Sequence, residues 1–106
     1  MKCPDKCSCQ QRTVRCVRQQ LKLIPELPAD TNIFDLRFNH IKEVPTDAFK
    51  GLTQLHSIFL NDNQITTLLP GAFDGLPSLR FLYLNQNHIR SIASNAFTNL
   101  TKLERL

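Results

Sequence analysis

The four cysteines of this chain lie close together near the N-terminus, in the pattern Cys3-x3-Cys7-x-Cys9-x6-Cys16. Clustered cysteines form either a zinc site or disulfide bonds. Zinc sites usually use close pairs of ligands that a longer stretch separates, whereas these four residues are crowded and have no histidine among them. We therefore expect two disulfide bonds, which place the protein outside the cytosol. The sequence leaves three pairings open.

Other residues that could do chemistry do not combine into a catalytic motif. The chain has no Ser/His/Asp order, no glycine-rich phosphate loop and no H-E-x-x-H pattern. We therefore predict no catalytic residue and no enzymatic activity for this segment.

The elements that must position the remaining side chains follow from a repeat of 24 residues. The stretch 55–65 has the pattern L-x-x-I-x-L-x-x-N-x-I. The same pattern returns in both directions, at Leu79, Leu82, Leu84, Asn87 and Ile89 and at Thr31, Phe34, Leu36, Asn39 and Ile41. This is the leucine-rich repeat pattern, in which each unit is one short strand and a return segment.

Each repeat is one coil of a solenoid, and the coils must stack to bury their apolar edges. Side chains alternate along the strand, so we expect Ile58 and Leu60 to face the core. A buried amide at the turn after each strand can satisfy free backbone groups, which favours the ladder of Asn39, Asn63 and Asn87. Phenylalanines at the same interval, Phe49, Phe73 and Phe97, are expected to stack on the return side.

These patterns predict an α/β-type solenoid of mostly short parallel strands, a fragment of a right-handed horseshoe. Residues 1–30 would form the cysteine-rich cap, with a strand at 13–17 against the first coil. Full repeats would cover 31–54, 55–78 and 79–102, and a fourth would begin at 103–106. Because no closing segment follows, we expect an open apolar end and a longer parent chain.

Composition and charge narrow the classes of partner. The 106 residues are 42% hydrophobic and carry a net charge of +4, with the basic residues spread along the chain. Nucleic-acid binding favours a basic stripe, so this class is disfavoured. No apolar run approaches the roughly 20 residues needed to span a bilayer. No secretory signal precedes Cys3.

The predicted positions of the three histidines argue against a shared metal site. His40 and His88 lie two coils apart, and adjacent strands are about 4.8 Å apart, so their rings would sit roughly 10 Å from each other. Zinc–nitrogen bonds are about 2.0–2.1 Å, and His56 lies in a different column. We therefore predict no metal site.

The concave strand face is the better candidate for function. Aromatic residues and arginine dominate binding hot spots, and exposed apolar patches mark interaction sites. The predicted partner-binding residues are Asp35, Arg37, Phe59, Asn61, Phe81, Tyr83 and Asn85. Two other interpretations stay open, in which these aromatics cover sheet edges or touch a neighbouring domain, or the chain is a structural spacer.

One glycosylation sequon is present at Asn99-Leu100-Thr101, in a return segment away from the strand face. We expect Asn99 to be a glycosylation site if the protein is secreted.

The cysteine cap followed by 24-residue units resembles extracellular leucine-rich repeat proteins with a cysteine-rich N-terminal cap. That resemblance implies the pairing Cys3–Cys9 and Cys7–Cys16. Within that family, the segments 12–16 and 35–41 most resemble the N-terminal repeats of the peroxidasins, especially invertebrate forms. The resemblance to those repeats extends through 59–63 and 81–85.

Peroxidasins are secreted matrix proteins that join such repeats to immunoglobulin domains and a haem peroxidase acting on collagen IV. The resemblance implies a matrix-targeting role, with an extracellular matrix or cell-surface protein as partner. No residue here corresponds to the peroxidase, so no cofactor is expected in this segment and haem belongs to the parent chain. The alternative family is Slit-like proteins or receptor ectodomains, which share the cap and repeats.

Overall fold

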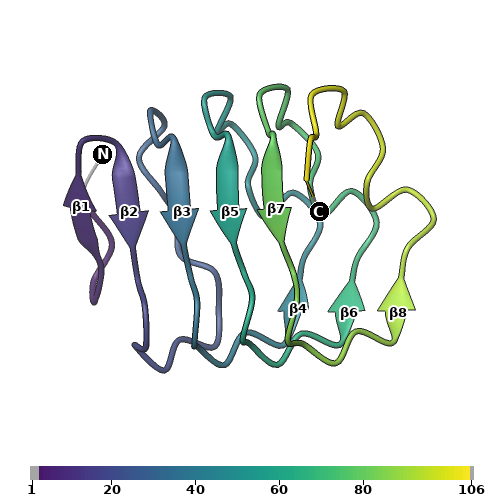
Figure 1. Cartoon of the computed structure of the whole chain (residues 1–106), viewed down its shortest axis with the longest axis horizontal. Coiled ribbons are helices and arrows are strands. Elements are labelled where there is room, and N and C mark those ends of the chain that lie inside the picture. Colours follow the sequence, from purple (N-terminus) through teal and green to yellow (C-terminus); the bar gives the residue numbers. More distant parts are fainter. Residues whose placement is uncertain (1–2, 106) are drawn as a thin grey trace.

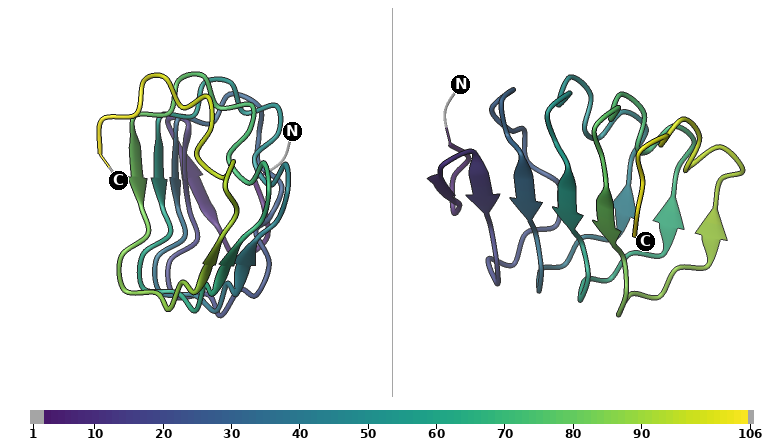
Figure 2. Two further views of the ribbon diagram at one scale, coloured as in Figure 1. Left: turned by 90° about the vertical axis from the view of Figure 1, so that its right-hand side faces the viewer. Right: turned by 45° about the horizontal axis from the view of Figure 1, so that its top comes forward.

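The computed structural model describes residues 3–105, which wind through stacked coils with strands on two opposite sides (Figure 1; Figure 2, left). The eight strands in chain order are β1 (Ser8–Gln10), β2 (Thr13–Arg15), β3 (Ile33–Asp35), β4 (Glu43–Val44), β5 (Ser57–Phe59), β6 (Thr67–Leu68), β7 (Phe81–Tyr83) and β8 (Ser91–Ile92).

The longer sheet has the order β1-β2-β3-β5-β7. From β2 onward its strands are parallel, and residues 24 apart face each other between β3, β5 and β7. An isolated parallel bridge from Phe81 to Arg105 continues the same interval. The repeat predicted from the sequence therefore sets the register of this sheet.

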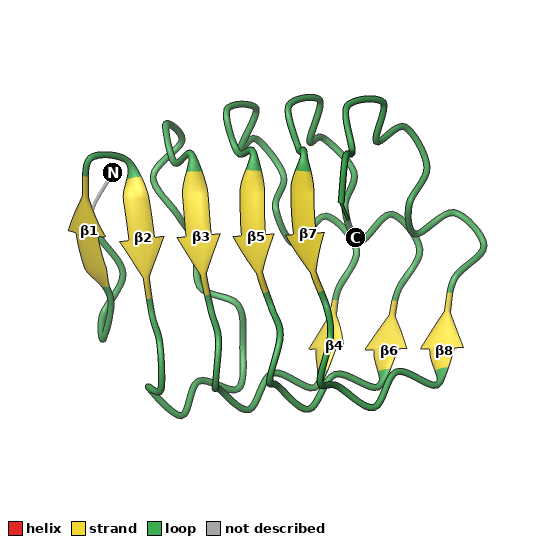
Figure 3. Ribbon diagram, in the orientation of Figure 1, coloured by secondary structure: helices red, strands yellow, loops and turns green. Residues whose placement is uncertain are grey.

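The second sheet has the order β4-β6-β8 and is also parallel, with its residues again 24 apart. Turns and loops connect the two sheets, and residues 3–105 contain no helix, as Figure 3 shows. The predicted solenoid of short parallel strands is confirmed, but its α/β label is corrected to a β-solenoid. The return segments form short strands and successive turns in place of helices. It follows that no helix of the described part could cross a membrane.

The core lies between the two sheets. Ile58 and Leu60 are fully buried, as the alternation along the strand predicted. On the return side Phe49, Phe73 and Phe97 form a stack, with ring centroids 5.9 and 5.8 Å apart and planes within 9° and 8°. This aromatic stack ties three coils together through offset ring contacts.

Asparagine side chains join each coil to its neighbour. The Nδ2 group of Asn63 donates to the carbonyl oxygens of Leu36 and Leu60, and its Oδ1 accepts from the Ile41 amide. Asn39 and Asn87 make the equivalent bonds. The ladder therefore satisfies backbone groups that the turn leaves free, which is the role the sequence predicted.

The cap closes the N-terminal end of the longer sheet. Strand β2 pairs with β3 as predicted, and β1 adds an antiparallel strand on its outer side. The disulfides join Cys3 to Cys9 and Cys7 to Cys16, the pairing that the family resemblance implies. Cys16 is fully buried, so the second disulfide anchors the cap to the core.

The opposite end of the stack is less covered. Val44 and Leu68 are 0% and 1% exposed, whereas Ile92, in the same column of the last coil, is 55% exposed. Phe97, Leu100 and Leu103 pack against the core but are only partly buried. Leu106, which the sequence also assigned to this apolar end, lies outside the described residues.

Candidate functional site

The outer surface of the longer sheet, which we call the strand face, carries one row of facing side chains. Arg15, Asp35, Phe59 and Tyr83 occupy equivalent positions on β2, β3, β5 and β7. Each projects away from the core because its neighbours along the strand point inward. The row therefore brings a cation, a carboxylate and two aromatic rings together on adjacent strands.

Asp35 differs from the prediction, because it is only 3% exposed. Its Oδ1 accepts from Nε of Arg37 at 2.9 Å and its Oδ2 accepts from Nη2 at 2.7 Å. The Arg37 amide also donates to Oδ1 at 3.2 Å. A two-point pair of this kind fixes the guanidinium plane, so Asp35 positions Arg37 and is not itself a contact surface.

Arg37 in turn lies beside the aromatic pair. Its guanidinium carbon is 5.6 Å from the ring centroid of Phe59, within the range of a cation–π contact. The hydrogen bond to Asp35, together with the charges of Asp35 and Asp62, raises the pKa of Arg37 above its ordinary value. The arginine is therefore charged throughout the range in which proteins are stable.

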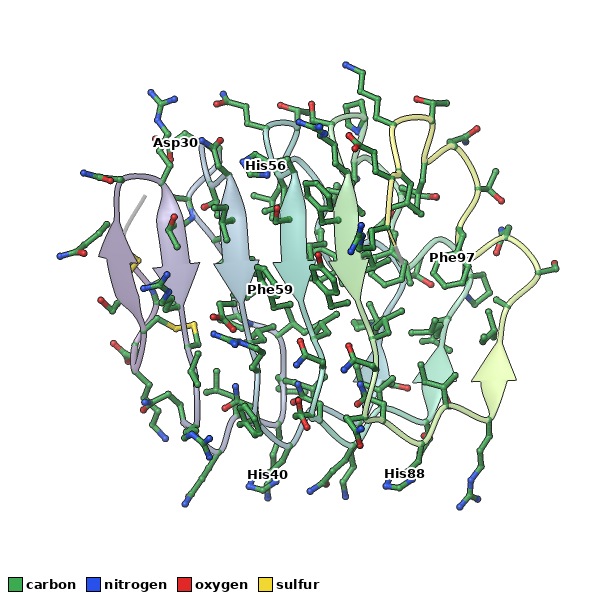
Figure 4. The ribbon with its side chains drawn as sticks, viewed as in Figure 1. Asp30, His40, His56, Phe59, His88 and Phe97 are labelled. Carbon is green, nitrogen blue, oxygen red and sulfur yellow. A yellow bond between two sulfur atoms is a disulfide. The ribbon has the colours of Figure 1, made fainter. Side chains whose placement is uncertain are left out.

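Phe59 and Tyr83 stack face to face, with centroids 5.0 Å apart and planes within 11°. Both rings are half-buried, as is Phe81, so they are less exposed than the sequence suggested. Stacking explains the difference, because each ring covers one face of its neighbour. Figure 4 shows Phe59 near the middle of the strand face.

Ser57, in the row beside them, is only 6% exposed. Its neighbours across the sheet are the larger Ile33 and Phe81. Its hydroxyl oxygen lies 2.8 Å from Nδ1 of His56.

Charged and amide groups surround the aromatic rings. Arg80 lies 5.4 Å from the centroid of Phe81 and pairs with Glu104 in the next coil. Asn61 is half-buried and donates to Oδ2 of Asp62 at 2.8 Å, while Asn85 is exposed. The aromatic centre therefore has a polar rim, which is the anatomy of a protein-binding surface.

Sequence reasoning missed Arg15, which is exposed and faces Asp35 across the sheet. The cap coil has 20 residues where the later ones have 24, as the facing of Val14 and Phe34 shows. A search for apolar positions at this shorter interval would have placed Arg15 in the row.

The histidines lie apart, as the repeat spacing indicated. His40 and His88 occupy the lower edge of the molecule in Figure 4, separated along the stack, and His56 lies at the upper end of β5. Nδ1 of His40 is 2.9 Å from Nε2 of Gln64. Within residues 3–105 no three side chains of His, Cys, Asp or Glu come close enough together to hold a metal ion.

Asn99, the sequon residue, occupies a turn position that glycine holds in the two preceding coils. Its φ is 67°, compared with 85° at Gly51 and 79° at Gly75. Asparagine tolerates this left-handed conformation better than other side chains. Asn99 and Thr101 are both exposed, so the sequon is accessible on the return side.

Comparison with known proteins agrees with this geometry. The sequence profile described as "Leucine rich repeat" matches residues 31–89. The chain belongs to the leucine-rich repeat family. Its fold is that of a repeat domain and not of a catalytic one.

Among its relatives is peroxidasin of Drosophila melanogaster, with 58% identity over 59 aligned residues. The aligned stretch covers 56% of this chain and 4% of that protein. The chain is 44% identical over 60 residues to the peroxidasin homolog of Homo sapiens, covering 57% and 4%. The chain thus corresponds to a small part of these relatives, and the resemblance to peroxidasin repeats is confirmed.

A solved structure extends the similarity to the cap. The crystal structure of human trophoblast glycoprotein superposes with a TM-score of 0.86 at 34% identity, covering 92% of this chain and 38% of that one. That coverage must include part of the cysteine-rich region, because residues 31–106 are 76 of the 106 residues and so less than 92% of the chain.

Proposed function

We propose that the strand face binds a protein of the extracellular matrix, and that this segment serves as the matrix-targeting arm of a peroxidasin-like protein. The observation that carries the proposal is the linked set of Asp35, Arg37, Phe59 and Tyr83. Arginine and tyrosine are among the residues that contribute most to binding energy.

The arrangement favours binding because its side chains are already held in place. The carboxylate of Asp35 holds Arg37, and Tyr83 stacks on Phe59. Immobilising a flexible side chain costs about 0.5–1.5 kcal/mol on association, and a preformed surface avoids much of that cost. We therefore place Arg37, Phe59 and Tyr83 at the centre of the interface, with Asn61, Phe81 and Asn85 at its margin.

An extracellular location supports the choice of partner. Disulfides persist in oxidising compartments, and both cap disulfides are formed. The similarity to peroxidasins supports secretion into the matrix. Any haem chemistry would belong to regions of those relatives that this chain does not match.

The proposal is tested by retention on decellularised basement membrane. The double variant Phe59→Ala/Tyr83→Ala should lose retention, whereas Ile92→Ala should bind as the wild type does. Ile92 is a suitable control because it is an exposed apolar residue on the other sheet. Unchanged retention of the double variant would exclude the strand face as the matrix-binding surface.

A second candidate function is ligand binding in a cell-surface ectodomain of the Slit-like or receptor type. The similarity to trophoblast glycoprotein across 92% of the chain supports keeping this alternative, because it shows the same fold in a protein outside the peroxidasins. In that case the wild type would bind intact cells stripped of matrix, and the matrix itself would not retain it.

A further inference from the structure

The second sheet has an open edge at β4. Strand β4 pairs with β6 on one side only, and Figure 1 shows it as the first of the three strands. Later coils are joined along this stretch by three backbone hydrogen bonds, from the amides of Gln64, Thr66 and Leu69 to the carbonyls of Ile41, Lys42 and Val44. Along the same stretch between the cap and the first repeat, the described residues make one such bond, from the His40 amide to the Leu21 carbonyl.

The sequence explains why the pairing stops. Pro45 stands where Leu69 stands in the next coil, and proline has no amide hydrogen to donate. On the cap side, Pro25 has a fixed φ and restricts Ile24 to an extended conformation. Within the described chain, residues 22–24 make no backbone hydrogen bond to β4. After Leu21 the cap segment therefore forms no strand pairing with β4, although Ile24 and Leu27 still pack on the core.

A groove of ≈ 520 Å³ lies along this unpaired edge, lined by residues 22–24, by residues in and beside β4, and by Thr66 of the next coil. Leu23, Ile24 and Pro45 form its apolar surface, and Lys22 and Lys42 lie on its rim. Leu23 is 81% exposed, more than the other large hydrophobic residues that are exposed in the described part, Phe38 and Ile92. An exposed apolar side chain beside an open strand edge is a feature that binding sites share.

We propose that this groove binds an extended peptide with alternating apolar and acidic residues. The volume lies in the range of about 300–1,000 Å³ that ligand sites occupy. An extended segment would place apolar side chains against Leu23 and Ile24. Its backbone would lie along β4, whose outer edge has no strand partner in the described chain.

The charge of the rim selects the partner. Lys22 and Lys42 both line the groove, the first on the cap segment and the second directly before β4. Glu43 is the one carboxylate that lines the groove, so two lysines against one glutamate leave a positive rim. Acidic side chains of a bound peptide would face this pair, and a basic peptide would be repelled.

This groove and the strand face share no residues, because they lie on opposite sheets. A peptide could therefore occupy the groove while the strand face binds its own partner. The two surfaces are tested by different variants, and the result for one does not depend on the result for the other.

The test uses a fluorescent peptide of alternating glutamate and valine, about six residues long, titrated with the chain and followed by anisotropy. We expect saturable binding, and about tenfold weaker binding of the matching lysine and valine peptide. Leu23→Asp should weaken the Glu/Val complex about tenfold. Circular dichroism checks its fold, which should persist because Leu23 is exposed.

The matched control is Ile92→Asp, which adds the same charge at an exposed residue on the other edge of the same sheet. It should leave the affinity unchanged, as should Phe59→Ala/Tyr83→Ala. The double variant Lys22→Glu/Lys42→Glu should reverse the preference between the two peptides. Absence of binding by the Glu/Val peptide, or equal affinity for wild type and Leu23→Asp, would overturn the proposal.

Discussion

Asp35 lies buried beneath Arg37, and its two carboxylate oxygens hold the guanidinium at 2.9 and 2.7 Å. This pair determines the shape of the strand face, because it fixes Arg37 beside the stacked rings of Phe59 and Tyr83. A buried carboxylate is costly unless it is paired and hydrogen-bonded. Here three donors of Arg37 form hydrogen bonds with the Asp35 carboxylate and offset the free-energy cost of burying it.

Removing Arg37 should therefore destabilise the fold. In Arg37→Met, an apolar side chain of similar length can still cover Asp35, which keeps one backbone donor and loses both side-chain donors. We expect this to cost about 1–3 kcal/mol. The double variant Asp35→Asn/Arg37→Met should recover part of this loss, since the neutral amide is less costly to bury. Urea denaturation measures both. Equal stability of the single and double variants would show that the buried charge is not the cause.

The asparagine ladder gives a second stability prediction. Asn63→Ala leaves the Ile41 amide without its acceptor, while the Leu36 and Leu60 carbonyls each keep one donor, from Asn39 and Asn87. We expect a loss of about 1–3 kcal/mol. Asn85→Ala, at an exposed position on the strand face, serves as the control and should change stability by less than about 0.5 kcal/mol. Thermal and urea unfolding should rank the two variants clearly. Similar losses would contradict the ladder's role.

The periodic parts of the fold could be predicted from the sequence, because each repeat places the same residue type in the same backbone position. The register of β3, β5 and β7, the asparagine ladder and the aromatic stack all follow from the 24-residue interval. Alternation along a strand gives the direction of a side chain but not what covers it.

For that reason the burial of Asp35 was not foreseen, since it depends on where the side chain of Arg37 folds back. Arg15 was missed because the cap coil has a shorter interval. The groove at β4 was missed because it arises where a coil departs from the repeat at Pro45. Features that break the period need the three-dimensional structure.

The sequon gives a prediction on modification. Expressed through a secretory pathway, the chain should carry an N-glycan at Asn99, visible as a mass that glycosidase removes. Asn99→Gly preserves the left-handed turn that Gly51 and Gly75 adopt, and Thr101→Ala keeps the asparagine. Both variants should lose the glycan without losing the fold. A glycan mass that persists in both would place the modification elsewhere.

Glu104 provides a test by pH. Its hydrogen bond with Arg80, helped by the charges of Arg80 and Arg105, lowers the pKa of Glu104 below its ordinary value of 4.5. Because the folded-state pKa is lowered, the stabilising contribution is present above the unfolded-state pKa and is lost as pH falls through the folded value. NMR titration of the carboxyl carbon should show the shift.

The variant Arg80→Met removes this partner and should return the pKa of Glu104 toward 4.5. Lys102→Met removes a nearby positive charge that does not contact Glu104 and should leave the pKa unchanged. A lowered pKa that survives Arg80→Met would show that the ion pair is not its source.

The most direct test of the central claim is to find which face touches the partner. A photo-crosslinking side chain placed at Asn85 lies exposed on the strand face, and one at Ser94 lies exposed in a return segment. On illumination with basement membrane, the chain labelled at Asn85 should form adducts and the chain labelled at Ser94 should not. Adducts from Ser94 alone would contradict recognition through the strand face.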